Sequence, residues 1–350
     1  MLDITLEDAL FRRPDSRFML RADHTFHGGT HTALIGPPGG GKSTLLDLLH
    51  GSLKLDQGRI LFGTRDAAAL KPARRPILFA APAPDFPPRW SVQHVLIAAL
   101  QRRGLDRTDR LAELLDLSTK WKLETLSERR FSTLSDGEQL RVRFAEIEAL
   151  RPAVVLANRL LSLSSAFDRL GQAEHLFRSL RIIGSTLVSE ISHFEELGLC
   201  DQVVVIDGGS LVQSGSPRRV FDAPRSRAAA RASGRTSLIP IHVTGRTVES
   251  AIGTWTVETS PFSGSGIAIV RPDHFRIAAA GEESDLILNV EEASFADGRW
   301  EAAGLLVGGS VLHVRLPGSL PLHKGKLLPL RYDPSSFVLL PGELDEAAGK

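Results

Sequence analysis

The chain has 350 residues, 42% hydrophobic and 24% charged, which is enough for two globular domains with buried cores. Its 42 Lys and Arg residues nearly balance 41 Asp and Glu residues, and the formal net charge of +1 argues against a general nucleic-acid binder. Cys200 is the only cysteine, which excludes an internal disulfide and a zinc site of several thiolates and fits a reducing cytoplasm.

The N-terminal stretch predicts a β-strand. Residues 1–8 include three acids and lack a basic start followed by an apolar core, so they do not resemble a secretory signal. The most apolar helix-like stretch, Val92–Leu100, is far shorter than the ~20 residues of a bilayer span. We therefore expect membrane contact only through a partner protein.

Short apolar and β-branched runs then alternate with helical stretches, a pattern typical of an α/β layer with parallel strands. The predicted strands are Thr32–Ile35, Ile60–Phe62, Ile77–Phe79, Val154–Leu156, Thr186–Val188 and Val203–Ile206. Residues of about 85–150 lack strand signals and predict a helical insert. Its expected helices are Val92–Arg103, Arg107–Leu117 and Glu138–Leu150.

A change of composition follows residue 223. Residues 224–237 are rich in arginine and small residues, which predicts a linker, either simply solvated or forming a basic strip near anionic lipid. Residues 238–350 predict a small all-β, barrel-like domain, because short alternating segments are separated by Gly, Pro and Asp turns. Examples are Ile241–Val243, Gly266–Val270, Asp285–Val290 and Ser310–Leu316.

The clearest motif lies between the strand Thr32–Ile35 and an apolar helical run. It reads Gly36-Pro37-Pro38-Gly39-Gly40-Gly41-Lys42-Ser43-Thr44 and matches the phosphate-binding pattern G-x-x-x-x-G-K-[ST]. The glycines let the backbone bend around phosphate oxygens, and the helix N-terminus directs amide donors at them. Lys42 would contact the β and γ phosphates, and Ser43 would bind Mg²⁺. The loop predicts a nucleotide site.

A second motif indicates the protein family to which the nucleotide site belongs. The segment Leu134-Ser135-Asp136-Gly137-Glu138 precedes a helical run and resembles the L-S-G-G-Q signature of ATP-binding-cassette (ABC) ATPases, with Asp136 in place of a glycine. The resemblance implies ATP and Mg²⁺ as ligands. It also implies a dimer in which this motif faces the γ-phosphate held by a second ATP-binding subunit. Taken alone, the same residues are also compatible with a simple helix cap.

The order of later motifs also resembles ABC ATPases over residues 1 to about 223. Ser192-His193 resembles the switch histidine, whose place after a strand favours a hydrogen bond from His193 to the γ-phosphate over a purely structural role. Ser165-Ala166-Phe167-Asp168 resembles the D-loop that contacts the partner subunit, through Asp168. Phe11 is a candidate for stacking on adenine, with a core aromatic as the alternative.

The C-terminal domain carries a further resemblance. Ile269-Val270-Arg271-Pro272-Asp273-His274 resembles the R-P-E-H turn of oligonucleotide-binding-like (TOBE) domains in importer ATPases for sugars, polyamines, iron, molybdate and thiamine. In those families the domain is regulatory or supports the dimer. The resemblance implies that a separate ABC permease subunit carries the solute across the membrane.

The sequence departs from the family where ATP would be hydrolysed. The strand Val154–Leu156 should end in an Asp-Glu pair, but Asn158 and Arg159 stand there. Asn158 keeps a hydrogen-bonding oxygen without the charge, and Arg159 cannot accept a proton. The glutamine expected after the strand Ile77–Phe79 is absent as well, because Ala80 and Ala81 follow it. These changes predict ATP binding with weak or absent hydrolysis.

The sequence is compatible with two functions. The first is the ATP-binding subunit of an ABC importer, peripheral on the inner face of the cell membrane, which works as a homodimer or heterodimer on a permease. The second is a hydrolysis-deficient, regulatory or structural paralogue that pairs with a competent subunit. A P-loop kinase or GTPase would carry neither the signature segment nor Ser192-His193.

Overall fold

The computed structural model describes residues 1–81, 86–162, 169–259 and 262–342. Contacts divide the chain into two compact units, Met1–Arg218 and Arg219–Lys350. This division falls slightly before the boundary at residue 223 that the change of composition suggested.

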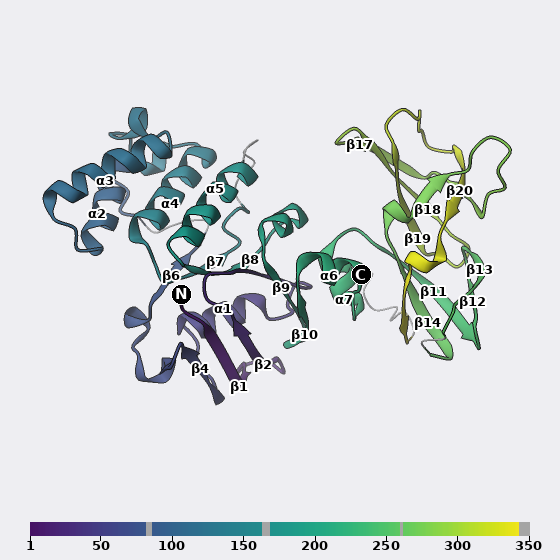
Figure 1. The fold of residues 1–350 in the computed structure, drawn as a ribbon, viewed down its shortest axis with the longest axis horizontal. Coiled ribbons are helices and arrows are strands. Elements are labelled where there is room, and N and C mark those ends of the chain that lie inside the picture. The colour runs from purple at the N-terminus through teal and green to yellow at the C-terminus, as the bar shows by residue number, and fades with distance from the viewer. Residues whose placement is uncertain (82–85, 163–168, 260–261, 343–350) are drawn as a thin grey trace. The chain divides into compact units, whose positions relative to one another are not determined.

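A ten-stranded sheet runs through the first unit (Figure 1). In sheet order its strands are β5 (Arg65–Asp66), β4 (Gln57–Phe62), β1 (Ile4–Arg12), β2 (Met19–Phe26), β10 (Ser210–Gly215), β9 (Gln202–Asp207), β3 (His31–Ile35), β8 (Thr186–Glu190), β7 (Val154–Asn158) and β6 (Ile77–Ala80). Strands β9, β3, β8, β7 and β6 pair in parallel, whereas β2, β1 and β4 form an antiparallel part. The predicted α/β layer with parallel strands is confirmed.

Five helices of the first unit contribute to its two cores or to the site. They are α1 (Lys42–His50), α2 (Val92–Arg102), α3 (Arg107–Lys120), α4 (Asp136–Leu150) and α5 (Arg169–Ile182). Ser91 and Asp106 cap α2 and α3 by accepting backbone N–H groups of the first turn. Helices α2 to α4 lie between β6 and β7 in the sequence, and with α5 they gather at one end of this unit (Figure 1). The predicted helical insert is therefore present.

Successive side chains of β7 belong alternately to two hydrophobic cores, one on each face of the sheet. Val154 and Leu156 pack with the leucines of α1, whereas Val155 and Ala157 pack with α2, α4 and α5. Val188 of β8 belongs to the α1 side as well. Because strand side chains alternate with a period of two, residues 158 and 190 at the ends of these strands also face α1.

His31 begins strand β3, which leads into the phosphate loop, and its side chain links this strand to β8. Its ring is buried, Nδ1 lies 3.1 Å from the carbonyl oxygen of Leu199, and Nε2 lies 2.7 Å from Oγ of Ser189. A carbonyl can only accept, so the neutral ring donates from Nδ1 and accepts at Nε2. Burial, with a smaller contribution from nearby Arg181, lowers the pKa of His31 to about 4. The folded protein therefore keeps this ring neutral.

His31 is expected to make the first unit sensitive to acid. Between pH 6.5 and 4 the unfolded chain binds a proton that the folded chain does not, so stability is full above pH 6.5 and falls as the pH drops, by about 3 kcal/mol in total. The measurement is urea unfolding from pH 7 to 4. His31→Gln should flatten the pH dependence, whereas His27→Gln, at an exposed position, should not. Equal pH dependence in His31→Gln and wild type would exclude His31 as its source.

The second unit contains small antiparallel sheets around a main hydrophobic core, with a smaller buried cluster that includes Ala230 and Leu238. The five-stranded sheet has the order β13 (Gly253–Thr256), β12 (Thr247–Ser250), β11 (Ser237–Thr244), β14 (Gly264–Val270) and β21 (Val338–Pro341). The two others are β15 (Phe275–Ile277), β20 (Leu327–Tyr332), β16 (Leu286–Asn289), and β17 (Glu292–Ala296), β18 (Arg299–Leu305), β19 (Val311–Pro317). This arrangement is consistent with the predicted TOBE-like domain.

The arginine-rich stretch 224–237 differs from the predicted linker. Residues 227–233 form helix α7 (Arg227–Ser233), which follows α6 (Pro217–Asp222) and buries its small residues. Arg271 of the R-P-D-H turn donates to the carbonyls of Phe221, Ala230 and Gly234, and its guanidinium lies 4.1 Å from the centre of the Phe221 ring. Burial lowers the pKa of Arg271 to about 10. Small residues here serve packing around a buried arginine.

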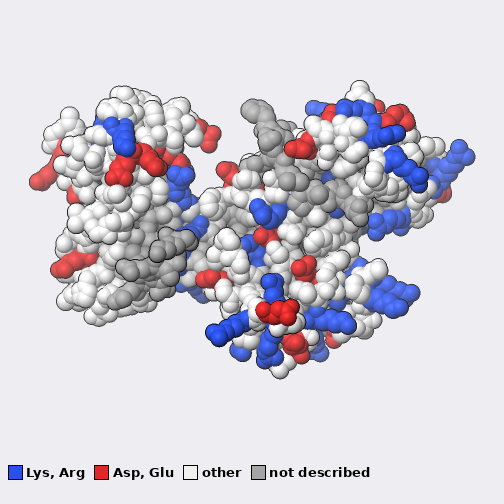
Figure 2. All heavy atoms as spheres, turned by 180° about the vertical axis from the view of Figure 1, so that it is seen from behind, with Lys and Arg blue, Asp and Glu red and all other residues white. Residues whose placement is uncertain are grey.

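Basic and acidic side chains are interspersed on the face drawn in Figure 2, as the near-zero net charge predicts. Exposed ion pairs occur on the surface, for example between Arg178 and Glu174, and such pairs contribute little stability. In the part of the chain that the structure describes, no helix combines the length and apolar character that a bilayer span requires.

Candidate functional site

The phosphate loop joins β3 to α1, as the motif predicted. A side chain at Gly36 would place a Cβ 1.9 Å from the carbonyl oxygen of Ile206, at the end of β9, and Gly36 has a φ of +143°. Gly41 precedes α1 with a φ of +114° and gives the helix no side-chain cap. The first turn of α1 therefore has backbone N–H donors without a side-chain acceptor, which suits a bound anion.

Lys42 and Ser43 begin helix α1 and face the loop. Lys42 Nζ donates to the carbonyls of Gly36 and Pro37, at 2.9 and 3.0 Å, so its ammonium group is held inside the loop. Ser43 Oγ donates to Glu190 Oε2 at 2.7 Å, and Lys42 Nζ lies 3.9 Å from Glu190 Oε1. The uncapped helix, the cation and the hydroxyl fit a triphosphate with Mg²⁺, and Lys42 and Ser43 would hold these groups.

Glu190 is a site residue that the sequence reasoning missed. It is 8% exposed and ends β8, beyond the predicted strand Thr186–Val188. The signal was present, because Glu190 is two residues beyond Val188 and must share its face in an extended strand. A charged residue at a strand position that alternation buries, two residues before Ser192, indicates a functional role.

Phe11 is buried rather than available to a ligand. Its ring is 6% exposed and belongs to the hydrophobic core beside α1, so the predicted adenine stacking lacks a free ring face and the alternative of a core aromatic fits instead. Phe18 and Arg13 lie closer to the phosphate loop. A Cβ at Gly41 would lie 3.0 Å from Phe18 Cζ, and Arg13 donates to Thr44 Oγ1 at 3.3 Å. No sequence motif marks these two residues, so the sequence analysis did not predict them.

The positions predicted to depart from the family lie at the ends of β7 and β6. Asn158 pairs in register with Glu190, and the Arg159 amide donates to the Glu190 carbonyl at 2.9 Å. Arg159 is exposed and has a φ of +49°, an unusual conformation for a residue with a side chain. Ala80 is buried at the end of β6, and Arg143 of α4 reaches the neighbouring Phe79 carbonyl at 3.3 Å.

His193 follows β8 and begins the short helix Phe194–Leu199. Its backbone N–H and that of Ser192 both donate to Glu196 Oε1 at 2.9 Å, which fixes the backbone that leads into His193. The hydrogen bond from His193 to a γ-phosphate stays a prediction. The D-loop candidate Asp168 lies outside the described residues.

The signature segment begins α4. Ser135 is its N-cap and forms a capping box with Glu138, so the helix-cap role considered from the sequence is present. The pKa of Glu138 is lowered chiefly because the backbone N–H of Ser135 donates to its carboxylate, at 2.8 Å. Leu134 is buried beneath the segment, while Asp136 at the first helical position is exposed.

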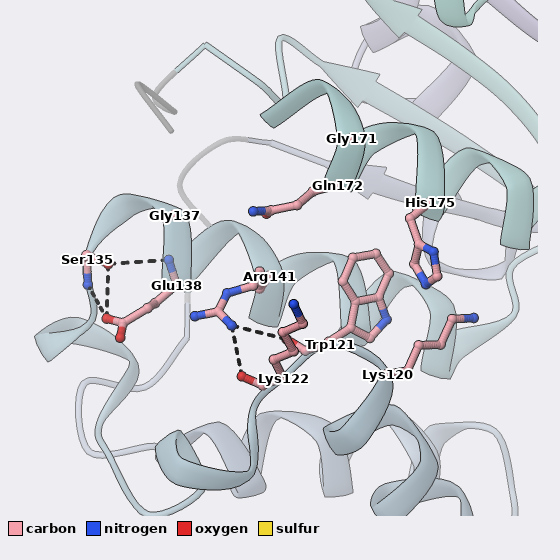
Figure 3. Close-up of a pocket in the computed structure, with 10 residues that line it drawn as sticks. All are labelled: Lys120, Trp121, Lys122, Ser135, Gly137, Glu138, Arg141, Gly171, Gln172 and His175. Atoms are coloured by element: carbon pink, nitrogen blue, oxygen red, sulfur yellow. Dashed lines mark hydrogen bonds between the residues drawn. The ribbon is translucent and has the colours of Figure 1, made fainter. Parts of the chain in front are cut away.

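An open pocket of about 530 Å³ adjoins the signature segment (Figure 3). Ser135, Gly137 and Glu138 line one part of it, and Lys120, Lys122 and Arg141 bring positive charge. The remaining lining residues are Trp121, Gly171, Gln172 and His175. Figure 3 shows that these side chains come from the start of α4, the end of α3 and the first turns of α5. The lining carries three basic side chains and one carboxylate, that of Glu138, so its charge suits an anionic ligand.

Sequence and structure comparisons agree with this geometry. The family model described as ABC transporter matches residues 20–158. An Fe(3+) ions import ATP-binding protein of Agrobacterium fabrum is 31% identical over 73% of this chain and 75% of its own length. An sn-glycerol-3-phosphate import ATP-binding protein of Cereibacter sphaeroides is 26% identical over 98% of this chain and 99% of its own.

Solved structures show the same fold. A cassette of an ABC transporter in its ADP conformation has a TM-score of 0.54 at 21% identity and covers 64% of this chain and 96% of its own. CbiO1 of Clostridium perfringens has a TM-score of 0.55 at 23% identity, over 62% of this chain and 90% of its own. With the phosphate loop and signature segment in place, the chain belongs to the ATP-binding proteins of the ABC transporter family.

Proposed function

We propose that this chain is the ATP-binding subunit of an ABC importer and that it binds MgATP at the loop Gly36–Thr44. The observation that carries the proposal is the loop itself: an uncapped helix N-terminus with Lys42 and Ser43 turned toward it. The names of the similar proteins support import as the direction of transport. The chain would lie on the cytoplasmic face of the membrane through contact with a separate permease.

We also propose that two ATP-binding subunits pair with nucleotide between them. The pocket beside Ser135 and Gly137 supports this, because it offers three basic side chains from a part of the unit other than the phosphate loop. His193 would reach the γ-phosphate. The partner is either a second copy or a related subunit.

Hydrolysis by this chain is proposed to be slow. Asn158 and Arg159 stand where an acid and a general base would be needed, and Arg159 is positively charged. Loss of a general base typically lowers the rate roughly 10²–10⁴-fold. Similarity to import ATP-binding proteins favours a transport role over that of a purely regulatory paralogue.

Pairing is tested by light scattering of the purified chain with and without MgATP. MgATP is expected to convert monomer into dimer, because slow hydrolysis leaves the nucleotide in place between the subunits. Gly137→Trp should prevent the dimer by filling the space beside the signature segment, yet the monomer should still bind ATP at the loop, without the added affinity that pairing gives. A dimer of the Gly137→Trp protein equal to that of the wild type would contradict the proposed interface.

A further inference from the structure

Glu190 is a buried acid placed against the phosphate loop. Its Oε2 accepts a hydrogen bond from the Ser43 hydroxyl at 2.7 Å, and Oε1 lies 3.9 Å from Lys42 Nζ. The side chain is about one tenth exposed, so water stabilises its charge only weakly. Its contacts are with the two residues of the loop that would bind phosphate and Mg²⁺.

The strand register places Glu190 beside Asn158. Strand β8 lies between β3 and β7, and Glu190 pairs with Leu34 on one side and with Asn158 on the other. Partners in neighbouring parallel strands point to the same face, and Leu34 and Val188 place that face toward α1. The carboxylate of Glu190 is therefore one strand away from the position whose acid the chain has lost.

A carboxylate at this place disfavours phosphate unless a cation lies between them. Lys42 is the nearby cation, and a bound triphosphate would share it. Mg²⁺ prefers carboxylate, hydroxyl and phosphate oxygens, and it is commonly held by one or two carboxylates together with substrate phosphates. In residues 1–81, 86–162, 169–259 and 262–342 no group of three or more His, Cys, Asp or Glu side chains is placed to hold a metal.

We propose that Glu190, at the end of β8, supplies the carboxylate for Mg²⁺. In the family an aspartate at the position of Asn158, at the end of β7, would supply it. The inference rests on the proposed binding of MgATP at the loop. Glu190 contacts the hydroxyl of Ser43, and this contact assigns it to the metal rather than to the attacking water. The metal part of the site is thereby retained, while the general base remains replaced by Arg159.

The test uses the full-length chain and a fluorescent, non-hydrolysable ATP analogue, titrated in Mg²⁺ and in EDTA. Mn²⁺ binding to the protein with the same analogue is followed by electron paramagnetic resonance. Glu190→Gln keeps the size of the side chain and an oxygen that accepts from Ser43. Glu174→Gln, on the exposed face of α5, makes the same chemical change away from the loop and is the control.

Wild type and Glu174→Gln are expected to bind the analogue more tightly with Mg²⁺ than in EDTA. In Glu190→Gln we expect that gain, and the affinity for Mn²⁺, to fall about 10- to 100-fold. Its affinity in EDTA should be retained or improved, which also shows that the variant is folded. Adding Asn158→Asp to Glu190→Gln should restore much of the metal dependence from the neighbouring strand.

An unchanged gain from Mg²⁺ in Glu190→Gln would overturn the inference. A loss that Asn158→Asp leaves unrestored would overturn it too, because the effect would not belong to a metal position that the two residues share. Failure of the proposed function has a different signature: the wild-type chain would not bind the analogue either with Mg²⁺ or in EDTA.

Discussion

Replacement of Arg159 by glutamate is expected to raise ATP turnover roughly 10²–10⁴-fold, the range that a general base contributes. Arg159 follows Asn158 at the end of β7 and cannot accept a proton from an attacking water. Glutamate supplies that acceptor at the same backbone position. The measurement is phosphate release by the dimer at saturating MgATP.

Arg159→Gln separates the two effects of this substitution. It removes the positive charge without supplying a base, so its turnover should rise much less than that of Arg159→Glu. The backbone at 159 already has a φ of +49°, so both variants have the same conformational cost as the wild type. Equal turnover in the two variants would show that charge alone, and not the lost base, limits hydrolysis.

Lys42→Ala is expected to weaken binding of MgATP about 10- to 100-fold, the effect of losing hydrogen bonds to a charged group. The Lys42 side chain is 11% exposed and is held at the loop carbonyls, so its charge acts where water screens it little. Its loss also leaves Glu190 facing the phosphates without a nearby lysine. Calorimetric titration with a non-hydrolysable ATP analogue measures the change.

Lys54→Ala is the matched control, because Lys54 is exposed and lies just beyond the same helix. It should bind the analogue like the wild type. A weak effect of Lys42→Ala, comparable with that of Lys54→Ala, would mean that the nucleotide is held elsewhere.

Local patterns in the sequence were sufficient for most of the fold. The phosphate loop depends on glycines and a Lys-Ser pair that are contiguous in the chain, and the parallel strands are short apolar runs with clear boundaries. The cap at Ser135 is also local, because Glu138 returns its hydrogen bond within one helical turn. Such features can be recognised without knowledge of the tertiary structure.

Residues brought together by the sheet could not be found in this way. The contact between Glu190 and Ser43 joins positions 147 residues apart and depends on the order of strands in the sheet. The same limit applies to Arg13 and Phe18, which approach the loop from the turn between β1 and β2. Phe11 was a reasonable candidate in sequence, but the irregularity of β1 between Leu6 and Ala9 places its ring in the same core as Leu6.

The stretch 224–237 was difficult for another reason. Helix α7 consists of small residues and arginines and has no apolar periodicity, so its pattern resembles a linker. The helix is stabilised by packing and by the carbonyl contacts of Arg271, a residue that follows in a distant strand turn. A motif can therefore have a structural role that its own sequence does not reveal.

The most direct test of this account is the chemical state of the nucleotide on the purified wild-type chain. The protein is mixed with radiolabelled ATP and Mg²⁺, freed of unbound nucleotide on a desalting column, and sampled over time. The account predicts that nucleotide is retained and recovered mainly as ATP after many minutes. Absence of retained nucleotide, or its prompt recovery as ADP, would contradict it.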